Sequence, residues 1–167
     1  PADVEWYEWF YCPGGCDEYC CDDSGTLDPN GRNMCVGKDS DLNGLYFIDG
    51  NIYMTEHLIT GNSTLVAGDS IFITNTHNLT LDAFYGNMLL YAGSGDITVH
   101  NANESVHNIK LEGILYAPNG HASIGEHNIK IPGSVIADTI HVTGHNIPLD
   151  EPQVDIVPPV SRPRFIW

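Results

Sequence analysis

The sequence is poor in basic residues: six lysines and arginines stand against 22 aspartates and glutamates, giving a formal net charge of -16. So few cations cannot form a face that holds a phosphate backbone, so nucleic acid is not expected as a partner. An acidic surface of this kind keeps a protein soluble and attracts divalent cations. A divalent cation is therefore the only candidate among cofactors.

Long apolar runs and clusters of strong helix formers are also missing. No stretch of 18 apolar residues occurs, so the chain carries no predicted membrane span. Hydrophobic residues nevertheless make up 42% of the 167 residues, which is typical of one globular domain with a real core.

Cysteine is absent after residue 35, and no Cys-x-x-Cys pair occurs, which disfavours a zinc or iron–sulfur site. The first 35 residues are rich in turn sequences and cannot bury much apolar surface. We therefore expect two disulfides, formed in an oxidising compartment, with their connectivity left open. The fifth cysteine is either free or bonded to another subunit. The disulfide candidates are Cys12, Cys16, Cys20, Cys21 and Cys35.

A His-Asn-aliphatic motif recurs at residues 77–79, 107–109, 127–129 and 145–147. Dividing the chain after each His-Asn pair gives "IKLEGILYAPNGHASIGEHN" and "IKIPGSVIADTIHVTGHN", which align at Gly113 with Gly133 and at 115–117 with 135–137. A repeat of 18–20 residues is too short for helical hairpins. Short alternating segments broken by Gly, Asn and Pro indicate strands instead.

The repeat predicts an all-β fold, a right-handed parallel β-helix (β-solenoid) of five to six coils over residues 44–149. The asparagine of each motif would turn a corner in the left-handed backbone region and stack about 4.8 Å from the next. The aliphatic residue after it would point into the core, and Lys110 or Lys130 to solvent. The expected turn ladder is Asn78, Asn108, Asn128 and Asn146.

Two stretches, "GLYFIDGNIYMTEHLITGNSTLVAGDSIFITNTHNLTL" and "GILYAPNGHASIGEHNIKIPGSVIADTIHVTG", resemble the β-solenoid domains of bacterial PilX-type pilus-assembly and cell-surface proteins. The resemblance implies an extracellular or cell-surface structural role with no catalytic residues. Such proteins usually start with a pilin-like membrane helix, which this chain lacks. The matching positions are Tyr46, Asp49, Gly50, Gly113, Tyr116, Ala117, Pro118, Asn119, Gly133 and Ala137.

Aromatic residues gather at both ends of the chain, in a cap or arm over residues 1–43 and a tail over residues 150–167. Residues 151–167 contain four prolines and should run extended. Because a solenoid has two open ends, such arms favour head-to-tail assembly into a filament or pilus-like homopolymer. The candidate assembly residues are Trp6, Tyr7, Trp9, Phe10, Tyr11, Phe165, Ile166 and Trp167.

Other chemistries rest on weaker patterns. Asn62, Asn78 and Asn103 begin Asn-x-Ser/Thr sequons and are glycosylation candidates in an exported protein. Imidazoles stacked one rung apart could bind zinc or copper or respond to acid. Those candidates are His77, His107, His127 and His145.

No pair of carboxylates has a spacing that indicates a glycosidase, so the chain is not expected to be an enzyme. The alternative to a structural subunit is a cell-surface adhesin or carbohydrate-binding module with surface glycans as partners. The terminal aromatic residues are the feature that leaves this alternative open.

Overall fold

The computed structural model of the protein describes residues 33–55, 57–74, 76–100 and 107–145. Every regular element in these ranges is a β-strand, so none of the described segments is a helix that could cross a membrane. The strands are β1 (Met34–Val36), β2 (Asp41–Ile48), β3 (Ile52–Met54), β4 (Thr60–Ala67), β5 (Ile71–Ile73), β6 (His77–Ala83), β7 (Met88–Ala92), β8 (Ile97–Val99), β9 (His107–Lys130) and β10 (Gly133–His145).

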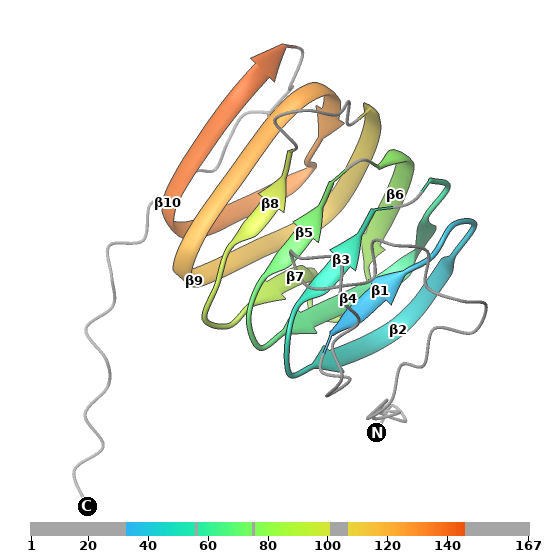
Figure 1. The fold of residues 1–167 in the computed structure, drawn as a ribbon, viewed down its shortest axis with the longest axis horizontal. Coiled ribbons are helices and arrows are strands. Elements are labelled where there is room, and N and C mark those ends of the chain that lie inside the picture. The colour runs from blue at the N-terminus through green and yellow to red at the C-terminus, as the bar shows by residue number, and fades with distance from the viewer. Residues whose placement is uncertain (1–32, 56, 75, 101–106, 146–167) are drawn as a thin grey trace, which may run out of the picture.

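All ten strands belong to one sheet, and every pairing between strands is parallel. The order is β1-β3-β5-β8-β9-β6-β4-β2, with β7 pairing β4 and β9, and β10 pairing β9. Figure 1 shows β1, β3, β5 and β8 side by side in one row, with β9 and β10 curving beside them. Each pass of the chain therefore lies on the previous one.

The long strand β9 bends through several parts of this sheet (Figure 1). It pairs with β6 at residues 107–112, with β7 at 114–116 and with β8 at 122–124. β10 then follows β9 from the Gly113–Gly133 pair to the His127–His145 pair, with one register shift between Ala137 and Thr139. β9 is therefore one continuous strand that pairs with three earlier strands in succession.

The core consists of inward side chains stacked one above another. Because the strands are parallel and in register, similar apolar residues stack on one another. Each fully buried Ile or Leu stabilises the fold by roughly 1.5–3 kcal/mol. The inward columns are Met34–Ile52–Ile71–Ile97–Ala122, Val36–Met54–Ile73–Val99–Ile124 and Leu65–Leu90–Leu115, all at most 3% exposed.

The structure confirms the all-β fold class and the alignment of the two sequence blocks. Gly113 pairs with Gly133, and residues 115–117 pair with 135–137. The aliphatic residues after His-Asn are also buried as predicted, with Leu79 and Ile129 at 0% and Ile109 at 1% exposure. The sheet begins earlier than residue 44, because β1 and the start of β2 already pair with β3 and β4.

Candidate functional site

Three histidine side chains stack across neighbouring strands near their starts: His77 and His107 are the first residues of β6 and β9, and His57 precedes β4. The rings of His57 and His77 have centroids 4.6 Å apart, and those of His77 and His107 are 5.3 Å apart. Nδ1 of His57 is buried without a hydrogen-bond partner. We call His57, His77 and His107 the histidine column. His57 belongs to it although it lacks the following Asn, which is why the motif search missed it.

Burial lowers the pKa of His77, and the neighbouring His57 and His107 lower it further by charge repulsion. The rings of His77 and His107 lie on adjacent strands, because these two residues pair in the register of β6 and β9. A proton on the central ring would therefore lie close to two other imidazoles. The column favours the neutral state of His77 in the folded protein.

We expect acidification to destabilise the protein through His77. The unfolded chain keeps a pKa near the ordinary value of about 6.5, so below that pH it binds more protons than the folded chain. The free energy of unfolding should fall as the pH drops below about 6.5, down to the lowered pKa of the folded state. Urea unfolding of wild type and His77→Gln between pH 7.5 and 5 measures the difference.

The His77→Gln variant should lose less stability than wild type over this range. His121→Gln is the matched control, because it removes an exposed histidine that is not in the column. Equal losses in wild type and His77→Gln would contradict the assignment of the effect to the column.

An asparagine follows His77, His107 and His127, and each of these asparagines turns the chain. Asn78, Asn108 and Asn128 have φ values of 57°, 56° and 56°, in the left-handed region. Nδ2 of Asn108 donates to Oδ1 of Asn78 at 3.1 Å, so the side chains bond from one rung to the next. Asp39 and Leu58 have the same backbone conformation, with φ of 57° and 60°. The corner therefore recurs where the sequence carries no asparagine.

A second polar ladder lies at another corner, and sequence analysis did not find it. Oδ1 of Asn51 accepts the N–H of Ser70 at 3.0 Å, and Oγ of Ser70 accepts the N–H of Asp96 at 3.0 Å. Asn33 and Asp96 extend the ladder in the same way, to the N–H groups of Asn51 and His121. The sequence pattern that could have revealed this ladder is a small polar residue directly before the first apolar residue of β1, β3, β5 and β8.

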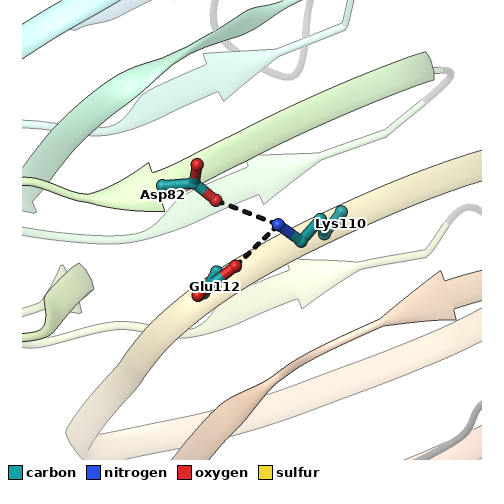
Figure 2. A network of polar contacts seen from close by, with 3 residues as sticks. All are labelled: Asp82, Lys110 and Glu112. Atoms are coloured by element: carbon teal, nitrogen blue, oxygen red, sulfur yellow. Dashed lines mark hydrogen bonds and ion pairs between the residues drawn. The ribbon is translucent and has the colours of Figure 1, made fainter.

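Lys110 lies between two carboxylates on the outer surface (Figure 2). Its Nζ is 2.6 Å from Oε2 of Glu112 and 3.3 Å from Oδ1 of Asp82. These hydrogen bonds, to Glu112 first and then to Asp82, raise the pKa of Lys110. Because all three side chains are 41% to 52% exposed, solvent screens the group and it contributes little stability. It neutralises part of an acidic surface.

Only some of the residues predicted to bind a metal, carry a glycan, form a disulfide or take part in assembly lie within the described ranges. No group of three or more His, Cys, Asp or Glu among the described residues is arranged to hold a metal ion. His127 and His145 pair in the register of β9 and β10. Asn62 and Asn78 are exposed, and Cys35 is a half-buried free thiol. The remaining predicted residues lie outside the described ranges: Trp6, Tyr7, Trp9, Phe10, Tyr11, Cys12, Cys16, Cys20, Cys21, Asn103, Asn146, Phe165, Ile166 and Trp167.

The last strand leaves core positions uncovered. Ile140 continues the column of Ile97 and Ala122, and Val142 continues that of Val99 and Ile124. Ile140 is 36% exposed and Val142 42%, whereas Ile97 and Val99 are fully buried. Among the described residues β10 pairs with β9 alone, so its other edge offers unpaired backbone groups beside these side chains.

In comparisons with known proteins, no family profile matches the chain, and neither a curated protein nor a solved structure does.

Proposed function

We propose that the protein is a structural subunit of an extracellular filament or pilus-like homopolymer. In this proposal the parallel sheet closes into a right-handed β-solenoid of five to six coils, and copies join through the ends of the solenoid. The terminal segments that precede β1 and follow residue 149 strengthen the joint. The resemblance of residues 44–149 to PilX-type surface proteins supports the extracellular location.

The proposal rests on β10, which pairs only with β9 among the described strands. Its exposed edge lies beside Ile140 and Val142, two aliphatic side chains in core positions. At the other end, β1 and β2 pair only with β3 and β4 among the described strands. Since all pairing is parallel, β2 of one copy can continue the sheet from β10 of another in the same direction. A contact between two different ends does not close, so it produces a filament.

Electron microscopy of the purified full chain tests this function. At high protein concentration and about 0.15 M salt, which limits repulsion between acidic copies, we expect filaments. Val142→Lys places a charge in the proposed joint and should abolish them. His141→Lys is the matched control, because it adds the same charge to the adjacent, outward position of β10, and it should leave filaments intact. Compact monomers of wild type at high concentration would contradict the proposal.

A further inference from the structure

The two ends of the stacked strands differ in how far their core side chains are exposed. The inward column that runs from Met34 in β1 to Ile140 in β10 is 1% exposed at its first residue and 36% at its last. The neighbouring column runs from Val36 to Val142, with exposures of 3% and 42%. Among the described strands, each of these four residues has a paired strand on one side only. Equivalent positions are therefore covered at the β1 end and open at the β10 end.

The inward side chains of β2 at the same end are also covered. Leu42 and Tyr46 are 6% and 8% exposed, although β2 is the last strand in the order of the sheet. No strand in the described ranges lies beyond β1 or β2, and Figure 1 shows both at the opposite end of the stack from β10. A large side chain reaches so low an exposure only where other atoms lie over it. Because these exposures are those of a single chain, the cover belongs to the same chain.

We infer that residues 4–11 cap the β1 end of the core in the isolated chain. This stretch, "VEWYEWFY", has five aromatic side chains and a valine among its eight residues. Each aromatic side chain buries roughly 150–250 Å², so a few of them suffice to cover the end of a core. Residue 33 leads directly into β1, so the stretch approaches the fold from this end. The connecting residues 12–32 can span roughly 70 Å when extended, which is ample for folding back over β1 and β2.

The segment that follows β10 fits this end less well. It leaves the sheet at the opposite end of the stack (Figure 1). Its aromatic residues are Phe165 and Trp167, at its far tip. Each intervening strand adds about 4.8 Å, so this tip would have to pass along the whole stack to reach β1. Residues 4–11 supply more apolar surface without crossing the stack.

Such a cap would hold back assembly, a consequence that rests on the function proposed above. The joint between copies places β10 of one chain against the end formed by β1 and β2 of another, where residues 4–11 lie. Both cannot occupy this end at once, so the cap competes with the second copy. A short tether gives the cap an effective concentration in the millimolar range, which exceeds that of dilute copies. Once displaced, residues 4–11 are free to bind the neighbouring copy and strengthen the joint.

Photo-crosslinking of the full chain tests the cap. The photoreactive residue p-benzoylphenylalanine replaces Trp9, and in a second variant Tyr7, in a dilute, equal mixture of unlabelled and nitrogen-15-labelled protein. The matched control carries it at Trp167, an aromatic position in the other terminal segment. We expect crosslinks within one chain from positions 7 and 9 to residues 34–48, at several times the control yield. In filaments the crosslinks should instead join labelled to unlabelled chains.

Tryptophan fluorescence provides a second measurement. Trp167→Phe leaves Trp6 and Trp9 as the only tryptophans of the protein. Acrylamide should quench their fluorescence several-fold less in the folded chain than in urea. Adding Val36→Lys, which places a charge beneath the cap, should increase the quenching. Val142→Lys is the matched control, because it makes the same change at the other end of the same column and should leave the quenching unchanged.

Crosslink yields equal to the control at both positions, or equal quenching in the folded and unfolded chain, would overturn the inference. Crosslinks to residues 133–145 would overturn it as well, because they would place the stretch at the opposite end. Crosslinks between chains in the dilute mixture would show that a second copy supplies the cover, which also contradicts it. Crosslinks within one chain without filaments would refute the filament proposal and leave the cap intact. Filaments formed by a protein with control-level crosslinks would do the reverse.

Discussion

Replacing Gly61 by alanine is expected to lower the free energy of unfolding by at least about 3 kcal/mol. Gly61 lies in β4, between Leu42 of β2 and Leu81 of β6. Its φ is +144°, a conformation that a side chain rarely tolerates. A Cβ atom there would overlap the backbone carbonyl of Leu42, which cannot move without breaking the pairing of β2 and β4.

The expected loss is large compared with the total stability of a domain, which is about 5–15 kcal/mol. Chemical denaturation of purified wild type and Gly61→Ala measures it, with low soluble yield of the variant as a further sign of instability. Gly37→Ala is the matched control: a Cβ at Gly37 meets no atom within 4 Å, and Gly37 has no positive φ. The control should stay within about 0.5 kcal/mol of wild type. A stable Gly61→Ala variant would show that β2 and β4 do not approach this closely.

The second large effect is expected from Ile97→Ala, with a loss of about 2–5 kcal/mol. Ile97 is fully buried in β8, between Ile71 of β5 and Ala122 of β9. Its truncation removes apolar contacts with both neighbouring rungs and leaves a cavity, because the backbone pairing on both sides prevents the rungs from closing.

Ile140→Ala provides the matched control in the same column. Ile140 is 36% exposed and has a rung on one side only among the described strands, so its truncation should cost about 1 kcal/mol or less. Both variants are compared by denaturant unfolding at low protein concentration, where copies do not associate. Equal losses would mean that another layer covers β10 in the monomer, which would remove the basis of end-to-end assembly.

Much of the fold could be read from the repeated motif. The His-Asn-aliphatic spacing identified the period, the left-handed turn at Asn78, Asn108 and Asn128, and the burial of the following aliphatic residue. These features are local: asparagine tolerates a positive φ, and the side chain of the residue after the turn points into the core. The alignment of residues 115–117 with 135–137 was correct for the same reason.

The register of the earlier strands could not be read in this way. Paired residues are separated by 18 positions between Asn33 and Asn51 but by 30 between Asn78 and Asn108. Insertions of different length conceal the repeat period in the sequence. In addition, Asp39 and Leu58 make the same left-handed turn without the His-Asn motif. Both turns are bonded to the next pass of the chain: the carbonyl of His57 accepts the N–H of Asp39, and that of His77 accepts the N–H of Leu58.

The sequence by itself determined that this chain forms strands, because its apolar residues alternate between turns and nowhere follow a helical period. It also determined which residues start the repeats that carry the His-Asn motif. Only the tertiary structure decided which side chains meet: the histidine column with His57, the ladder from Asn33 to His121, and the neighbouring rings of Tyr91 and Tyr116. Those contacts depend on how successive passes stack, and stacking is a property of long-range register that local propensity does not encode.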